Sequence, residues 1–353
     1  MIWHPWPGIR DDEADVIELS TTSEDLTALD PVQGPLLVVA VTAPEPAALD
    51  EGPDSGSEAT PDKNDAPPPG PRAPELTEGA RRVLGDDGAA LLAALGFEAS
   101  EAATVRLAAT VGPVAGRAVL VVGLGPASKV TPETLRRAAG AAVRAAGDVV
   151  ALATDLATLE VGAGEPSVRL SAVVEGLLLG DYRYDAYRSK PSPRRLTRAV
   201  ITGVTDGDAV VERARVGAEA AIWVRDLVNT PPKDKRPPVL ADTVVAGLAD
   251  DDVAVRVLDE HELAAGGYGG ILGVGGGSTM KPRLVELRWQ PEGAQRHVAL
   301  VGKGITFDTG GYSLKPTAGQ ETMKMDMAGA AVAAGVVRAS RSPRTSCRVM
   351  RSA

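Results

Sequence analysis

The residue types most suited to chemistry lie in residues 301–337, VGKGITFDTGGYSLKPTAGQETMKMDMAGAAVAAGVV, where two aspartates and three lysines share a glycine-rich segment. These charged residues are Lys303, Asp308, Lys315, Lys324 and Asp326. Charged side chains usually lie on solvated helical faces, whereas here they alternate with glycines, hydroxyls and methionines that permit close backbone approach to an ion or a substrate. The pattern predicts half of a metal site.

Each charged residue type has a role that a metal site can use. A carboxylate is a hard ligand that can bridge two cations ~3.5–4 Å apart, which is the role open to Asp308. Lysine is a rarer ligand than aspartate, because an ammonium with an ordinary pKa of ~10.4 must first lose a proton, which a nearby dication would drive. Asp326, beside the start of an Ala-rich helix, would bring a second carboxylate to the same ions. Any one of these residues alone would more simply form a surface ion pair.

Strands and helices must bring these residues together. The apolar run 297–301 predicts a strand that leads into the charged loop, and loops at strand carboxyl ends are where α/β sheets bind ligands. Upstream, strand-like and helix-like segments alternate, which predicts an α/β fold. Thr131 and Pro132 mark a helix start, as N-cap and first helical residue. The predicted strands are 35–41, 118–122, 200–201, 253–257 and 284–289, and the predicted helices are 89–95, 131–146, 173–179, 209–227 and 239–248.

The composition limits the classes of protein to which this chain can belong. A length of 353 residues with 44% apolar and 24% charged residues allows two globular domains with separate cores. Aromatic residues make up only 3%, which favours Ala-, Val- and Leu-rich helices packed on a buried sheet. The net charge of -10 argues against nucleic acid or an anionic membrane as partner. A small molecule or a peptide is the better candidate for the partner of this acidic chain.

Cysteine usage and hydropathy predict the compartment. Cys347 is the only cysteine, so the chain has no internal disulfide and no zinc–thiolate cluster. The first twenty residues contain no apolar core of signal-peptide length, and no segment approaches the ~20 uninterrupted apolar residues of a membrane span. We therefore expect a cytoplasmic protein.

Three further patterns have simple interpretations. Residues 42–80 are rich in Pro, Gly, Asp and Glu, which predicts a disordered loop or linker. The glycine run 266–277 lacks the Lys-Ser or Lys-Thr of a phosphate-binding loop, so close packing beside a site is the favoured interpretation. Tyr182, Tyr184 and Tyr187 follow a predicted helix and are typical of a helix end that packs onto a neighbouring domain.

Several motifs in order resemble the leucyl aminopeptidase, or cytosol aminopeptidase, family. The most specific are GKGITFDTGGYSLKP at 302–316 and ETMKMDMAGAA at 321–331. The others are EGLLLGDYRYDAY, RDLVNTPP, GVGGGS and PRLVEL, so the resemblance covers most of residues 36–337. One such motif can mislead, but several in the same order rarely do.

This resemblance implies a metal-dependent exopeptidase that removes N-terminal residues, often leucine, from peptides. It implies an N-terminal macro-like α/β domain followed by a mixed-sheet α/β metallopeptidase catalytic domain, assembled as a hexamer. Two divalent ions, manganese or zinc, would be held by Lys303, Asp308 and Asp326, with Asp308 bridging both. Lys315 would be the catalytic lysine, and Met323, Asp326 and Lys303 would contact the substrate.

The sequence departs from the family pattern at its carboxyl end. The family's second motif, Asn-Thr-Asp-Ala-Glu-Gly-Arg, which supplies further ligands, does not occur in this sequence, so we expect a truncated catalytic domain with impaired activity. The alternatives are a non-catalytic binding or assembly subunit and an unstable fragment. The expected organisation is an unassigned extension at 1–34, an α/β domain at 35–190, a partial catalytic domain at 191–337 and a basic tail at 338–353.

Overall fold

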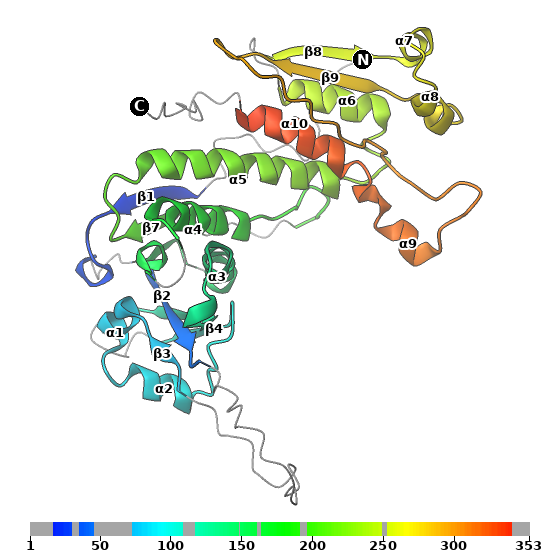
Figure 1. Ribbon diagram of the computed structural model, residues 1–353. Coiled ribbons are helices and arrows are strands. Elements are labelled where there is room, and N and C mark those ends of the chain that lie inside the picture. Colours follow the sequence, from blue (N-terminus) through cyan, green and yellow to red (C-terminus); the bar gives the residue numbers. More distant parts are fainter. Residues whose placement is uncertain are drawn as a thin grey trace, which may run out of the picture. The chain divides into compact units, whose positions relative to one another are not determined.

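The computed structural model of the protein describes residues 17–29, 35–45, 73–108, 117–147, 149–160, 164–190, 196–248 and 253–340. The chain divides into two compact units. The amino-terminal unit comprises Asp15–Asp181 and Arg194–Ala214, and the described part of the carboxyl-terminal unit comprises 182–190 and 215–340. Both are α/β, as the composition predicts, and Figure 1 shows their elements.

A seven-stranded sheet forms the amino-terminal unit, in the order β1-β7-β6-β2-β5-β4, with β3 paired to β2. The strands β1, β7, β6, β2 and β5 run parallel, whereas β4 and β3 pair antiparallel with their neighbours. The sheet is therefore mixed. The strands are β1 (Glu18–Thr22), β2 (Leu36–Ala43), β3 (Glu75–Leu76), β4 (Thr104–Leu107), β5 (Val119–Pro126), β6 (Ala151–Thr154) and β7 (Arg198–Thr202).

The central strand β2 and helix α3 show why these residues form these elements. The run LLVVAVT of β2 is buried throughout, as expected for a parallel strand covered on both faces. Helix α3 (Pro132–Ala145) begins with a capping box between Thr131 and Thr134, as the sequence predicts for its start. It packs closely on α4 (Pro166–Gly180). Glycine at position 176 permits this approach, since a side chain there would overlap the carbonyl oxygen of Arg136. The remaining helices are α1 (Glu78–Leu84) and α2 (Gly88–Ala94).

The domain limits differ from those expected. Strand β1 lies within residues 1–34, for which the sequence predicts no role, and its five residues pair in register with β7. Strand β7 belongs to the first sheet rather than to a second domain that starts at 191, because it pairs with β6 as well as β1. Strand pairing across distant sequence segments, which a local pattern does not encode, sets these limits.

The predicted linker at 42–80 is structured at both ends. Thr42 and Ala43 complete β2, and β3 pairs with it through Val41–Leu76 and Thr42–Glu75. Thr77 Oγ1 then donates a hydrogen bond of 2.7 Å to the carbonyl oxygen of Ala40. The centre of the segment, 46–72, lies outside the described residues, as does most of the predicted basic tail.

The carboxyl-terminal unit is built around the second half of α5 (Asp208–Asn229). Its apolar core joins α5 to α6 (Pro237–Ala246), to β9 (Leu284–Trp289) and to α10 (Ala328–Ser340), through residues that include Trp223, Leu227 and Met327. Strand β8 (Val253–Leu258) pairs antiparallel with β9 (Figure 1). The short helices are α7 (Glu260–Ala265), α8 (Gly269–Gly275) and α9 (Thr317–Glu321), and a single 3-10 turn, Met323–Met325, precedes α10.

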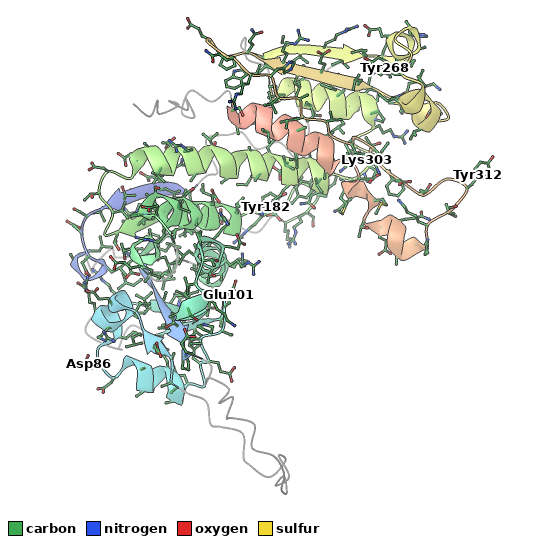
Figure 2. The ribbon with its side chains drawn as sticks, viewed as in Figure 1. Asp86, Glu101, Tyr182, Tyr268, Lys303 and Tyr312 are labelled. Atoms are coloured by element: carbon green, nitrogen blue, oxygen red, sulfur yellow. The ribbon has the colours of Figure 1, made fainter. Side chains whose placement is uncertain are left out.

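The run 297–301 is not the strand that its apolar pattern predicts. It lies within a long irregular loop between β9 and α9, and Val301 is 97% exposed. A strand needs a neighbour for its backbone N–H and C=O groups, and the sheet of this unit consists of β8 and β9 alone within the described residues. Figure 2 shows Tyr312 at the outer end of the same loop.

None of the helices in the described ranges has both the length and the apolar character that crossing a membrane requires.

Candidate metal centre in the carboxyl-terminal unit

Two glycines position Lys303 against the start of α10. The carbonyl oxygen of Lys303 accepts a 2.9 Å hydrogen bond from the N–H of Ala330, in the first turn of that helix. A Cβ at Gly302 would overlap the carbonyl oxygen of Gly329, and a Cβ at Gly329 would lie 3.0 Å from the Lys303 nitrogen. Only glycine therefore lets the loop approach the helix this closely. Figure 2 shows Lys303 on this loop.

Lys303 forms an ion pair with Asp326. Its Nζ lies 2.8 Å from both carboxylate oxygens of Asp326, with hydrogen-bond geometry to Oδ1. This hydrogen bond raises the pKa of Lys303, and the charges of Asp326 and Asp308 raise it further. The backbone hydrogen bonds of Met325 N–H to Thr322 and of Asp326 N–H to Met323 form the turn that carries this carboxylate.

Lys315 forms a second ion pair, with Asp308. Its Nζ donates to Oδ2 of Asp308 at 2.6 Å, while the N–H of Gly310 donates to Oδ1 at 2.8 Å. These two hydrogen bonds lower the pKa of Asp308, and the charges of Lys315 and Lys303 add to the effect. Gly310 has φ of 99°, a backbone conformation that favours glycine. The TGG sequence after Asp308 thus forms the turn that orients its carboxylate.

Met323 and Gln320 complete the surroundings of Lys315. The Met323 sulfur lies 3.2 Å from Lys315 Nζ, and Gln320 Nε2 donates a 2.6 Å hydrogen bond to the carbonyl oxygen of Lys315. Helix α9 and the turn Met323–Met325 therefore fix both ends of this lysine. The Lys315 ammonium is left half-buried, between a carboxylate and a thioether.

The five residues to which the family resemblance assigns site roles lie in one cluster: Lys303, Asp308, Lys315, Met323 and Asp326. Asp308 and Lys303 interact electrostatically, which connects the two ion pairs to each other. Lys324 points elsewhere, with its Nζ 3.5 Å from Oδ1 of Asn229. The structure thus brings the five site residues together. Their roles as metal ligands, catalytic lysine and substrate contacts stay predictions.

The donor set fits a divalent cation in part. Oδ2 of Asp326 is buried and is paired with Lys303 Nζ at 2.8 Å without hydrogen-bond geometry, so its present partner is a positive charge that a metal cation could replace. Carboxylate oxygens are ligands that Mn²⁺ and Mg²⁺ prefer, and a deprotonated Lys303 would add a nitrogen. Within the described ranges, no group of three or more His, Cys, Asp or Glu side chains gathers at one point. The described residues thus offer two carboxylates and one amine.

Sequence reasoning missed Lys235, which lies next to this cluster. Its side chain is fully buried, and its ammonium donates to backbone carbonyls of α5 and of the turn Met323–Met325. A lysine between Asp234 and Arg236 in a proline-rich loop is expected to be exposed to solvent, so no pattern in the sequence indicates that Lys235 is buried.

The three tyrosines after α4 contact the end of α5 and the loop that follows it. Tyr182 donates a 2.8 Å hydrogen bond to Asp226, and Tyr187 donates one of the same length to Asp234. The hydroxyls of Tyr184 and Thr230 lie 2.8 Å apart. These contacts anchor residues 182–187 within the carboxyl-terminal unit.

Two α/β units, the second with a lysine–aspartate cluster beside a glycine-supported helix start, define a two-domain α/β protein with an enzyme-like site in its second domain. The chain belongs to the cytosol aminopeptidase family. Residues 222–352 match the model of the catalytic domain of that family, and residues 74–191 match the model of its N-terminal domain. The resemblance found in the sequence motifs is confirmed.

Curated relatives match both units. A protein of Leifsonia xyli subsp. xyli named "Probable cytosol aminopeptidase" is 46% identical over 260 residues, which are 72% of this chain and 49% of the relative. One of the same name from Streptomyces coelicolor is 42% identical over 303 residues, 77% of this chain and 57% of the relative. The chain spans about half the length of the curated relatives it matches.

Solved structures agree on the fold. One described as the bottromycin maturation enzyme BotP in complex with Mn has a TM-score of 0.61 and 38% identity, covering 71% of this chain and 52% of that one. A mutant of tomato leucine aminopeptidase has a TM-score of 0.71 over 94% of this chain and 61% of that one. At 24% identity the latter shows the fold alone. The α/β class predicted for both domains is confirmed.

Proposed function

We propose that this chain carries the Lys303–Asp308–Asp326 part of the metal site of an aminopeptidase that releases N-terminal residues, leucine among them, from peptides. The observation that carries the proposal is the convergence of the Lys303–Asp326 and Lys315–Asp308 pairs, which brings two carboxylates and two amines together. Family membership and the manganese in the BotP structure support it.

Lys303, Asp308 and Asp326 would hold the metal. When bound, a divalent ion supplies a Lewis acid for the scissile carbonyl and lowers the pKa of a water molecule to about 7. Two ions, manganese or zinc, fit the family resemblance, with Asp308 as the bridge between them. In the present arrangement the Lys303 ammonium supplies the positive charge beside Asp326, so cation uptake must displace a proton from that amine.

Lys315 would stabilise the charge that develops during peptide cleavage. Its ammonium is held by Asp308 Oδ2 and Met323 Sδ and is supported through its own carbonyl by Gln320, so it is preorganised before substrate arrives. A fixed cation beside a developing oxyanion contributes more than one that must first reorient. Met323 would line the pocket for the first side chain, and the free amine of the peptide would bind near Asp326.

We also propose a cytoplasmic homo-oligomer, a hexamer by family resemblance, that acts on peptides. The net charge of -10 disfavours nucleic acid and anionic membranes as partners, and a single cysteine suits a reducing compartment. Sedimentation velocity of the purified chain, with and without Mn²⁺, tests the assembly, and a monomer under both conditions would contradict it.

The experiment for the metal site is calorimetric titration of the chain with Mn²⁺, together with hydrolysis of a leucine anilide. We expect Mn²⁺ uptake by the parent chain and its loss in Asp308→Ala and Asp326→Ala. Asp242→Ala is the matched control, since Asp242 is an exposed aspartate on α6 of the same unit. Uptake that survives both site substitutions would refute the proposal.

A further inference from the structure

Lys235 is a fully buried lysine in the carboxyl-terminal unit. Its side chain has 0% relative exposure and is the largest among the fully buried side chains of the described residues. A buried ammonium is costly unless its donors are paired. Lysine is rarely found in this environment, so its contacts call for a specific explanation.

Three carbonyl oxygens accept the three ammonium protons. Nζ of Lys235 lies 2.8 Å from the oxygen of Leu227, 2.9 Å from that of Val228 and 2.7 Å from that of Lys324. Leu227 and Val228 are in the last turn of α5, where carbonyls have no partner within the helix. The cation therefore meets the negative end of the helix dipole and satisfies two of its terminal carbonyls.

The third carbonyl belongs to the turn that precedes Asp326. Lys324 is the middle residue of Met323–Met325, and Asp326 ends that turn. The sulfur of Met327, a residue with 0% exposure, lies 3.5 Å from the same Nζ. Lys235 thus contacts the backbone two positions before Asp326 and the side chain one position after it.

We propose that Lys235 is a positioning residue that joins the carboxyl end of α5 to the turn 323–327 and so fixes the Asp326 carboxylate. This inference rests on the proposed function only in taking Asp326 to be a metal ligand. Lys235 touches neither Asp326 nor the carboxylate of Asp308; it acts through the carbonyl of Lys324 and the side chain of Met327.

The ionisation of Lys235 agrees with this role. Burial, and in second place the charge of Lys324, lowers its pKa to about 8. At pH 7 the side chain remains mostly protonated and keeps all three donors. Asn229 supports the same region from α5, since its Oδ1 lies 3.5 Å from Lys324 Nζ.

The test compares Lys235→Met with two controls in the full chain. Methionine keeps the length and removes the donors, and Lys235→Gln is the second variant if Lys235→Met does not unfold cooperatively. Lys233→Met removes an exposed lysine two residues away. Val244→Ala destabilises the same apolar core from α6 without touching the three carbonyls.

Two quantities are measured at pH 7: amide hydrogen exchange of residues 322–327 and the affinity for Mn²⁺. We expect Lys235→Met to accelerate exchange at Met325 and Asp326 about tenfold and to weaken Mn²⁺ binding about tenfold, as the loss of a residue that supports a metal ligand does. Both controls should stay within about twofold of the parent in both quantities, although Val244→Ala lowers the melting temperature.

Unchanged exchange in Lys235→Met would overturn the inference, and so would faster exchange with unchanged Mn²⁺ affinity. Equal effects in Val244→Ala would also overturn it, because they would reflect general destabilisation. If the parent chain takes up no Mn²⁺, the proposed function fails. Selective loss of exchange protection in Lys235→Met would in that case still establish that Lys235 holds the turn of Asp326.

Discussion

The ammonium nitrogen of Lys315 lies 2.6 Å from Oδ2 of Asp308, seven residues earlier in the chain. The carboxylate is therefore shared between a cation on one oxygen and the Gly310 N–H on the other. A metal that binds Asp308 must compete with or displace the Lys315 contact. The same contact holds the ammonium beside the cluster where negative charge would develop on a substrate.

Replacing Lys315 is expected to impair catalysis more than metal binding. In Lys315→Met, kcat for leucine anilide hydrolysis should fall by about 10²–10³, the usual effect of removing one stabilising donor, because the charge beside the reacting carbonyl is lost. Mn²⁺ affinity should be retained or slightly improved, because Asp308 loses a competing cation. Steady-state kinetics and calorimetry measure the two effects. Lys190→Met, at an exposed lysine outside the cluster, is the control, and a parallel loss of Mn²⁺ binding in Lys315→Met would contradict the assignment.

Gly302 should tolerate no side chain. In Gly302→Ala the new Cβ would overlap the carbonyl oxygen of Gly329, which pushes the Lys303 loop away from α10. We expect a loss of about 1–3 kcal/mol in the free energy of unfolding, together with weaker Mn²⁺ uptake.

Gly304→Ala is the matched control for this substitution. Its Cβ would lie 3.4 Å from the Cβ of Ala330, an ordinary contact, so stability and uptake should remain close to those of the parent chain. Urea denaturation and calorimetry give both quantities. Similar results for the two alanine variants would show that close approach at Gly302 does not position Lys303.

Local sequence patterns predicted the elements whose determinants are local. Thr131 and Pro132 mark the start of α3 because the cap, the fixed φ of proline and the helix all lie within four residues. The five site residues lie in one cluster because they fall within 24 consecutive residues of a loop, a turn and a helix start.

The features that were missed depend on distant partners. The run 297–301 has a strand-like composition but no neighbouring strand among the described residues, and β7 joins the first sheet through pairing with β1 and β6. The glycine run 266–277, which contains α8, packs closely only in part: side chains at Gly275 and Gly276 would overlap Pro282 and Leu272, whereas those at Gly269, Gly270 and Gly273 would meet open space. Lys235 is buried because the carbonyl of Leu227, eight residues before it, and that of Lys324, 89 residues after it, converge on its ammonium.

The contact between Tyr182 and α5 should contribute measurably to stability. The Tyr182 hydroxyl donates to Asp226 at 2.8 Å and accepts from Asn229 Nδ2 at 3.1 Å, and the Arg225 guanidinium lies 5.4 Å from the ring centre. Tyr182→Phe is expected to lower the free energy of unfolding by about 1–3 kcal/mol, because a hydrogen bond to a buried carboxylate is lost. Urea denaturation of the full chain measures this loss of free energy of unfolding.

Tyr187 provides the comparison for this prediction. Its hydroxyl donates to Asp234 at the same distance of 2.8 Å, but its side chain is 50% exposed, so water can replace the tyrosine. Tyr187→Phe should therefore change stability by less than about 0.5 kcal/mol. If both variants lost the same amount, burial would not determine the value of these contacts.

Asp155 should make the stability of the amino-terminal unit depend on pH. Burial raises the pKa of this carboxyl to about 6 in the folded protein, against an ordinary 3.8; its own backbone N–H opposes the rise, and the charge of Asp25 adds to it. Its Oδ1 is buried and accepts no hydrogen bond. Between these two pH values the folded state binds more protons than the unfolded state, so stability falls as pH rises from about 4 and the loss is complete near pH 6.

Asp155→Asn removes this charge and isolates its effect. We expect the variant to be more stable than the parent at pH 7 by about 1–3 kcal/mol, with the difference shrinking through pH 6 and 5 and vanishing near pH 4, where Asp155 is neutral in both states. Urea unfolding at each pH gives the two curves, with Asp86→Asn as a control at an exposed aspartate of the same unit (Figure 2). A constant difference between Asp155→Asn and the parent across this range would mean that the Asp155 carboxyl is solvated or paired in the folded protein, because only an uncompensated buried charge makes the two curves converge at low pH.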